Sequence, residues 1–341
     1  MPRGARVLIV RLSLTAAGWL CAWPVGAQPF VAAQSLPTSD AAPTSVADLE
    51  AGSIDFAPGV LTVIPPDVDR GDAIQRHDVV ELRADKSLEW DPFSTTVTRT
   101  LYEMAKDAPF TQNAWCLELA MKPLRMIEVD VPQPDGQISK QLVWYLVYRI
   151  RNSGTGLAGS VNSQGEFQTS AEGSDPVRFL PEFVLVSQDR TKTGERVRKA
   201  YLDRVVPAAI PAIARREMRG GKLLNSAEIA QLELPIETGR QQQGAWGVAT
   251  WVDVDPEIDF FSIFVGGLSN GYDWKDPAGA FKAGDPPGTG RTFTRKTLQL
   301  NFWRPGDEFG ENEREIRFGV PPQQGALYGV GEGVAYRWVY R

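Results

Sequence analysis

Apolar and polar residues alternate over many short stretches of this chain, and most of these stretches end in glycine, proline or asparagine. The strongest apolar run covers residues 142–151 and is followed by Asn152-Ser153-Gly154, which is typical of a strand that ends in a turn. An imperfectly alternating run over 117–131 precedes it, and Pro134-Asp135-Gly136 between the two predicts a β-hairpin. Similar patterns predict further strands at 61–64, 179–186, 247–254, 260–268, 297–303, 316–320 and 334–341.

The middle of the chain has the spacing of short helices rather than of strands. Thr193 can open a first helix, and Pro207 and Pro211 interrupt it, so we expect two short helices instead of one long helix. Asn225 and Glu228 have the spacing of a capping box, which predicts one or two further helical turns.

One strand pattern occurs twice, at residues 144–154 and 260–271, where an aromatic-rich strand ends on asparagine and glycine. Strands of this style resemble those of the immunoglobulin-like modules of exported bacterial proteins, although the Cys–Trp–Cys spacing of true immunoglobulin domains is absent. Any two buried strands before a turn share this pattern, so the number of units stays open. We therefore predict a mainly β fold: an immunoglobulin-like β-sandwich of one or two units with a short helical insert.

Residues 1–27 have the form of a secretory signal peptide. Arg3 and Arg6 form its positive start, a mostly apolar stretch follows, and Val25-Gly26-Ala27 supplies the small residues before a cleavage site. Residues 28–50 are rich in Ala, Ser, Thr, Pro and Gln and predict a flexible linker. The regions expected to follow are a β-sandwich region at 51–188, a helical insert at 189–235 and a second β-rich region, packed on the first, at 236–341.

Composition and charge narrow the class of protein further. The chain has 341 residues, of which 43% are hydrophobic and 23% charged, which excludes a largely disordered chain, a collagen and a polytopic membrane protein. Its net charge of −6 becomes more negative when the arginines of the signal peptide are removed, so we predict no nucleic-acid partner. No later apolar run is long enough to cross a bilayer. We predict a periplasmic or extracellular protein with no membrane span after signal cleavage.

The usual catalytic motifs are missing from the sequence. His77 is the only histidine, and no Gly-x-Ser-x-Gly elbow accompanies it, so a Ser-His-Asp or Cys-His arrangement would depend on this one residue. Cys116 is the only cysteine left after signal cleavage, which excludes an internal disulfide and predicts a small buried core residue. The glycine clusters at 284–290 and 329–333 lack the context of phosphate-binding loops. We predict no catalytic residue and no cofactor.

Four acidic residues occupy every second position of residues 253–259. On an extended chain Asp253, Asp255, Glu257 and Asp259 would share one face and could coordinate calcium, which prefers several oxygen ligands. The run lacks the glycine and the spacing of an EF-hand, and a solvated strand face followed by a turn is the competing interpretation. The same residues could supply paired carboxylates for glycoside hydrolysis, although the sequence does not show which two lie at catalytic separation.

Segment 189–222 is basic within an acidic protein, with ten Lys and Arg against four Asp and Glu. Such a surface could bind anionic envelope polymers or lipid headgroups. Solvated helix faces that pair with the acidic remainder of the protein are the competing interpretation. The candidate anion-binding residues are Arg196, Arg198, Lys199, Arg215, Arg216 and Arg219.

Aromatic residues are plentiful, with 10 Trp, 8 Tyr and 15 Phe. Several lie near predicted strand ends and turns, where carbohydrate-binding modules place the rings that stack on sugars. Core packing is the competing interpretation. The candidate sugar-binding residues are Trp246, Trp251, Tyr272, Trp274 and Trp303.

Together these patterns favour an exported, non-catalytic structural or binding protein of the cell envelope, whose partner is an envelope polysaccharide or another protein. Two alternatives stay open. One is a carboxylate-dependent glycan hydrolase. The other is an envelope assembly factor that holds a partner protein through an exposed strand edge or through the basic helices.

Overall fold

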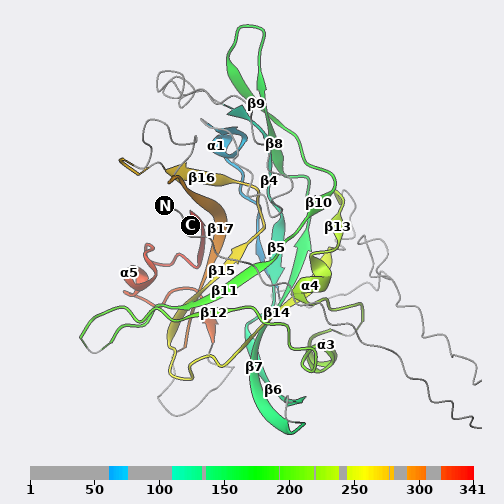
Figure 1. Ribbon diagram of the computed structural model, residues 1–341, viewed down its shortest axis with the longest axis vertical. Coiled ribbons are helices and arrows are strands. Elements are labelled where there is room, and N and C mark those ends of the chain that lie inside the picture. The colour runs from blue at the N-terminus through cyan, green and yellow to red at the C-terminus, as the bar shows by residue number, and fades with distance from the viewer. Residues whose placement is uncertain are drawn as a thin grey trace, which may run out of the picture. The chain divides into compact units, whose positions relative to one another are not determined.

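The computed structural model describes residues 61–75, 110–132, 136–191, 193–218, 220–237, 244–275, 277–279, 290–304 and 316–341. All of these residues belong to the unit Ala42–Arg341. They form a mainly β structure of several antiparallel sheets with a few short helices (Figure 1). No helix among them is long and apolar enough to cross a bilayer. The predicted signal peptide and linker lie outside the described residues.

One sheet of the described residues has five strands and is centred on β7 (Ile138–Arg151). β5 (Glu118–Met121) and β6 (Arg125–Pro132) pair with one side of β7, and β14 (Ala245–Val252) pairs with the other side, all antiparallel. β1 (Thr62–Ile64) extends the sheet beyond β5. The pairing of β6 with β7 reaches Pro132 opposite Ile138, which confirms the predicted hairpin.

The second large sheet has seven strands in the described part of the chain and is centred on β17 (Thr292–Trp303). β15 (Phe260–Gly266) and β16 (Tyr272–Lys275) pair with successive parts of one side of β17. On the other side of β17 lie β18 (Arg317–Phe318) and β19 (Tyr336–Tyr340). The sheet continues beyond β15 with β11 (Glu182–Ser187) and β12 (Ala200–Leu202).

Shorter elements complete the described structure. A three-stranded sheet contains β4 (Asn113–Trp115), β8 (Gly156–Val161) and β9 (Phe167–Ala171). The two-stranded pairs are β2 (Ile74–Gln75) with β3 (Phe110–Thr111) and β10 (Val177–Arg178) with β13 (Glu233–Leu234). The helices are α1 (Arg70–Ala73), α3 (Ile210–Glu217), α4 (Ser226–Ile229) and α5 (Gly325–Tyr328).

The two large sheets pack face to face through aromatic side chains. Trp144 and Tyr148 of β7 are almost fully buried. The ring of Trp144 lies 5.7 Å from that of Phe261 on β15, and the ring of Tyr148 lies 4.7 Å from that of Phe183 on β11, measured between centroids. Buried aromatic pairs of this kind contribute both apolar area and favourable ring geometry. The main core of the protein therefore lies between the two sheets.

Helix α3 covers the opposite face of the five-stranded sheet. Val143, Tyr145 and Val147 point to this face, between the residues of β7 that point into the main core, and they cluster with Ala209 and Ile213. Because side chains alternate along a strand, β7 is buried on both of its faces. This explains why its sequence is a continuous apolar run.

The middle of the chain matches the sequence prediction in part. The capping box is confirmed, because the side chain of Asn225 accepts hydrogen bonds from the main-chain N of Ala227 and Glu228, each at 2.9 Å. The helix predicted from Thr193 is wrong. That segment lies in the hairpin between β11 and β12, where the main chain of β12 pairs with the edge of β11, and this pairing outweighs the weak helix propensity of the segment.

Candidate functional site

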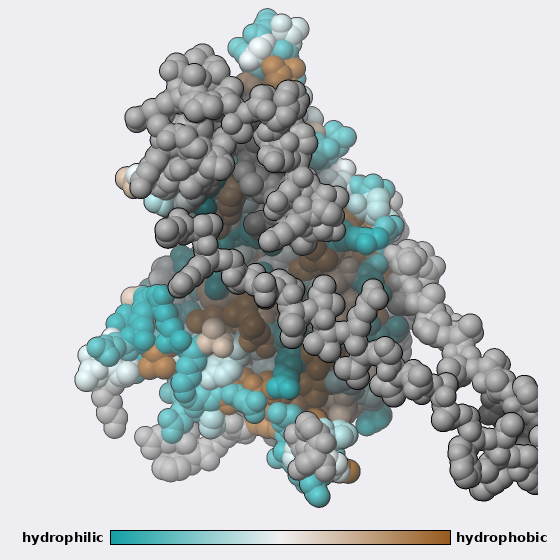
Figure 2. Space-filling model, in the orientation of Figure 1, coloured by the Kyte–Doolittle hydropathy of each residue, from teal (hydrophilic) through white to brown (hydrophobic). Residues whose placement is uncertain are grey.

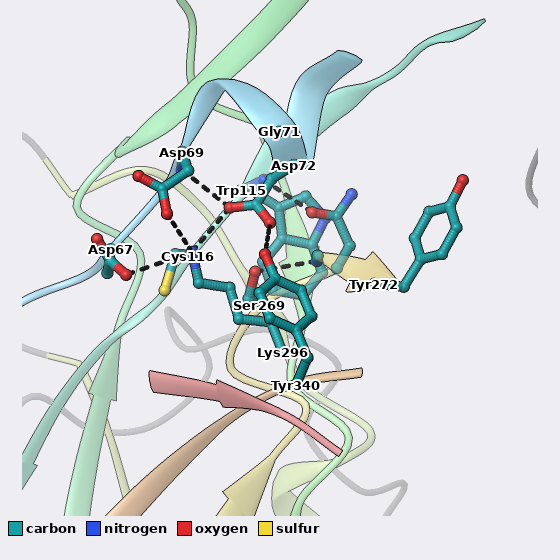
Figure 3. Close-up of polar contacts among 12 residues, drawn as sticks. Asp67, Asp69, Gly71, Asp72, Trp115, Cys116, Ser269, Tyr272, Lys296 and Tyr340 are labelled. Carbon is teal, nitrogen blue, oxygen red and sulfur yellow. Dashed lines mark hydrogen bonds and ion pairs between the residues drawn. The ribbon is translucent and has the colours of Figure 1, made fainter. Parts of the chain in front are cut away.

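A group of charged side chains with a buried centre surrounds the ammonium of Lys296 on β17 (Figure 3). Lys296 is 1% exposed, and its Nζ lies 2.8 Å from Oδ2 of Asp72, which is fully buried on α1. Asp67 and Asp69 belong to the segment between β1 and α1, and their Oδ2 atoms lie 3.3 and 3.7 Å from the same Nζ. Three carboxylates thus face one ammonium.

Both carboxylate oxygens of Asp72 also accept hydrogen bonds, one from a distant strand and one from the start of its own helix. Oη of Tyr340 on β19 donates to Oδ1 at 2.5 Å, and the main-chain N of Asp69 donates to Oδ2 at 2.9 Å. The ring of Trp338 lies 5.9 Å from Nζ of Lys296. The cluster therefore joins the segment at α1 to β17 and β19, which follow it much later in the sequence.

The loop between β15 and β16 packs closely against the Lys296 cluster. There the main-chain N of Lys296 donates to the main-chain O of Gly271 at 2.8 Å, and a Cβ at Gly271 would lie only 2.5 Å from Oδ1 of Asp72. The side chain of Asn270 holds the loop by accepting a hydrogen bond from the main-chain N of Trp115 at 2.8 Å. The predicted turn at Asn270-Gly271 thus separates two strands that both pair with β17, and glycine is required for the close approach to the carboxylate.

The carboxylates hold Lys296 in its charged form. Burial lowers the pKa of Lys296, but the hydrogen bond to Asp72 and the attraction of Asp72 and Asp67 outweigh this effect and raise the pKa overall. Burial and the hydrogen bond to Asp72 raise the pKa of Tyr340, so its hydroxyl stays a donor. Cys116 lies beside the cluster, and burial raises the pKa of its thiol to about 12.

These protonation states define what the cluster can do. At neutral pH the ammonium of Lys296 has no free lone pair and the thiol of Cys116 stays protonated, so neither acts as a nucleophile unless a neighbouring base first removes its proton. The charges instead connect parts of the chain, since Asp72 and Tyr340 are 268 residues apart. Removing one partner of a buried ion pair is strongly destabilising, because the other charge is left uncompensated.

A second polar location is a pocket of about 190 Å³ beside the β11–β12 hairpin. Its lining residues are Ser187, Asp189, Arg190, Val197, Lys199, Tyr201, Asp255, Glu257 and Ile258. Nζ of Lys199 donates to Oδ2 of Asp255 at 2.5 Å, and this hydrogen bond lowers the pKa of Asp255. Burial raises the pKa of Asp189, although its oxygens accept hydrogen bonds from Oγ of Ser187 and the main-chain N of Phe260.

The acidic run at 253–259 is the candidate calcium site. It forms a turn between β14 and β15 and does not extend as a strand. Asp253 adopts a left-handed φ of 57°, and Asp255 and Glu257 line the pocket. The main-chain N of Asp259 donates to Oδ1 of Asp189 at 3.3 Å. Within the described ranges, no group of three or more His, Cys, Asp or Glu side chains is arranged to hold a metal ion.

The basic segment is divided between two surfaces. The β11–β12 hairpin carries Arg196, Arg198 and Lys199, α3 carries Arg215 and Arg216, and Arg219 lies outside the described residues. Lys199 is paired with Asp255, and Arg216 donates to the main-chain O of Met126 at 3.1 Å. Arg198 and Arg215 are exposed. The hairpin belongs to the seven-stranded sheet and α3 covers the five-stranded sheet, so the five described residues do not form one patch.

The predicted sugar-binding aromatic residues are dispersed as well. Trp251 is fully buried between the sheets, and Trp246 is buried on the opposite face of β14, in the cluster with α3. Tyr272 is buried at the start of β16. Trp274 and Trp303 are half-buried, and each carries an arginine over its ring. Core packing therefore accounts for the burial of the first three.

Sequence patterns alone do not reveal the Lys296 cluster. The available signals are a lysine at the start of an alternating strand and three aspartates, Asp67, Asp69 and Asp72, soon after a strand. Neither signal shows that the two groups meet. Cys116 is buried as predicted, whereas His77 lies outside the described residues.

No protein-family model, curated protein or solved structure matches this chain. The geometry of these sites therefore carries the functional conclusions that follow.

Proposed function

We propose that this chain is an exported, non-catalytic structural or binding protein of the cell envelope, which acts in the periplasm or outside the cell. One observation carries the proposal: the basic residues Arg196 and Arg198 of the β11–β12 hairpin are exposed. The buried charges at Lys296, in contrast, hold chain segments together. In the cluster, the buried charges of Lys296 and Asp72 neutralise each other, and Asp67 and Asp69 lie at its more exposed side. The hairpin presents its charges to an anionic partner.

We infer that the two large sheets form a β-sandwich of the immunoglobulin-like style. Support comes from the ring contacts between Trp144 and Phe261 and between Tyr148 and Phe183, which join the sheets across the core. The antiparallel pairing of every strand in both sheets is also typical of such sandwiches. A rigid core of this kind supports hairpins and loops that bind partners.

The β11–β12 hairpin has the features of a surface that binds anions. It projects from the seven-stranded sheet (Figure 1), and its exposed residues are mostly hydrophilic (Figure 2). Arg196 and Arg198 are exposed near its end. Guanidinium groups bind phosphate and carboxylate through paired hydrogen bonds, and salt screens such exposed interactions. We therefore propose that this hairpin binds the anionic polymers or lipid headgroups of the envelope.

Retention of the purified protein on envelope fractions tests the proposal. Membranes and insoluble polysaccharide from the producing cell are incubated with the protein separately, over a series of salt concentrations. Arg198→Glu reverses a charge on the hairpin, and Arg215→Glu makes the same change on α3 as a matched control, since both side chains are exposed. We expect retention that salt abolishes and that Arg198→Glu weakens more than Arg215→Glu.

Other outcomes of this experiment have defined meanings. Retention on polysaccharide that survives high salt would point to aromatic stacking by Trp274 and Trp303 instead of the hairpin. Absence of retention on every fraction would overturn the envelope-binding proposal. A stable partner protein in cross-linking would then favour the assembly factor.

The pocket beside the hairpin supports a second candidate, a carboxylate-dependent glycan hydrolase. It brings Asp189, Asp255 and Glu257 to one cavity, and the pKa of Asp189 is raised by burial while that of Asp255 is lowered by Lys199. Carboxylates with pKa values shifted in opposite directions can serve as acid and base. Release of soluble sugar from envelope polysaccharide, lost in Asp189→Asn and in Asp255→Asn, would favour this candidate.

A further inference from the structure

Lys296 and Asp72 meet in a geometry that allows more than an ion pair. Nζ of Lys296 lies 2.8 Å from Oδ2 of Asp72, and the side chains are only 1% and 0% exposed. Groups that a fold holds at about 3 Å in a suitable orientation react as if they were present at very high concentration. The fold therefore keeps the amine and the carboxyl group in contact and shielded from solvent, which favours a reaction between them over a reaction with other groups.

We propose that Lys296 and Asp72 condense inside the folded protein and form an isopeptide bond between Nζ and Cγ. The ammonium supplies three protons and the carboxylate two oxygens. The new amide keeps one proton and Oδ1, and Oδ2 leaves as water with the other two protons. The positive and negative charges cancel, so no oxidant, reductant or further reactant is needed.

Two neighbouring side chains fit the steps of this condensation. Oδ2 of Asp67 lies 3.3 Å from Nζ, so it can take a proton from the ammonium, which frees the lone pair for attack on Cγ, and pass this proton to the departing Oδ2. Oη of Tyr340 donates to Oδ1 at 2.5 Å and stabilises the negative charge that develops there in the tetrahedral intermediate. The side chain of Asp67 is 46% exposed, which places the proton carrier on the solvent side of the cluster.

Another buried lysine–carboxylate pair has different neighbours. Nζ of Lys122 lies 2.9 Å from Oε2 of Glu217, and Oη of Tyr145 donates to Oε1 at 2.9 Å, as Tyr340 does to Asp72. The charged neighbours differ, because the guanidinium groups of Arg125 and Arg216 lie 3.6 and 3.8 Å from Oε1. Additional cations stabilise the ionised carboxylate, which is a poor electrophile. The Lys122 pair therefore serves as an internal control for the Lys296 pair.

The bond would join α1 to β17 across 224 residues of chain. The early segment of the described fold and its late strands would then stay connected when the protein unfolds. This cross-link does not depend on what the protein binds, so it extends the proposed function without relying on it.

Mass spectrometry of the denatured full chain tests the cross-link, once the N-terminus of the purified protein has been determined. The wild-type protein is expected to be lighter than its sequence requires by one water molecule. Tryptic digestion is expected to release a branched peptide that joins the segments around Lys296 and Asp72. Lys296→Arg keeps the positive charge but removes the reacting amine, so it is expected at full mass. Lys122→Arg is the matched control and is expected to keep the deficit.

Two results would overturn the proposal. The first is a wild-type protein at its full mass that yields no branched peptide, and this measurement is decisive even if Lys296→Arg fails to fold. The second is a water deficit that persists in Lys296→Arg, because the water would then come from another pair of groups.

Discussion

Replacing Gly271 with alanine adds one methyl group beside the Lys296 cluster and changes no charge. The new Cβ would lie 2.5 Å from Oδ1 of Asp72 and 3.1 Å from both Cγ of Asp72 and Cδ of Lys296. These atoms have little freedom to move, because Asp72 is held by Lys296 and by the hydroxyl of Tyr340. Either the loop or the carboxylate must shift.

The two responses set the range of the expected loss in stability. If the loop shifts and the ion pair survives, overpacking of this kind costs about 1–3 kcal/mol. If the pair is still ionic and Asp72 moves away, Lys296 keeps only its more exposed partners Asp67 and Asp69, and breaking a buried pair costs about 3–5 kcal/mol. We expect Gly271→Ala to lower the free energy of unfolding by about 3 kcal/mol, where the two ranges meet.

Gly71→Ala is the matched control for this substitution. Gly71 lies next to Asp72 on α1, but a Cβ there would meet nothing within 4 Å. Alanine in a short helix should therefore be neutral or stabilise the protein by up to about 1 kcal/mol. Urea unfolding followed by tryptophan fluorescence measures both variants. If Gly271→Ala unfolds at the same urea concentration as Gly71→Ala, the close packing of the loop against the ion pair is refuted.

Three further predictions concern single side chains. Tyr340→Phe removes one hydrogen-bond donor from Asp72 and should lower the free energy of unfolding by about 1 kcal/mol in urea, because Tyr340 is partly exposed; an unchanged midpoint would contradict this. Burial raises the pKa of Asp203 in the folded state, so the folded protein binds this proton more tightly and the free energy of unfolding falls as pH rises through the carboxyl range. Asp203→Asn should reduce this fall, and equal slopes in urea titrations across that range would count against it. Burial raises the pKa of Cys116 to about 12, so iodoacetamide should label it only after unfolding, and rapid labelling of the native protein would contradict the buried thiol.

Local sequence patterns predict the parts of this fold that depend on neighbouring residues. The apolar run of β7 predicts a strand because both of its faces are buried, and the capping box at Asn225 needs only residues within one turn. The spacing of Trp246 and Trp251 is an odd number of residues, which places them on opposite faces of β14. The alternation of side chains along a strand therefore argues against a shared sugar platform, although both residues were candidates for one.

Features that depend on distant segments could not be predicted in the same way. Lys296 and Asp72 are 224 residues apart, and neither local pattern specifies the other. The segment after Thr193 has a composition that is compatible with a helix, yet it lies in a hairpin because β11 offers an edge for β12. Contacts between distant segments thus form the candidate site, and they also explain why the helix predicted from Thr193 is wrong.

Export to the cell envelope is the central claim, because the proposed partner lies there. It is tested most directly by fractionating the producing cell and determining the N-terminus of the recovered protein. We predict that the protein is found in the periplasmic, envelope or external fraction and begins at Gln28, after removal of residues 1–27. Recovery from the cytosol with residues 1–27 still attached would contradict the account.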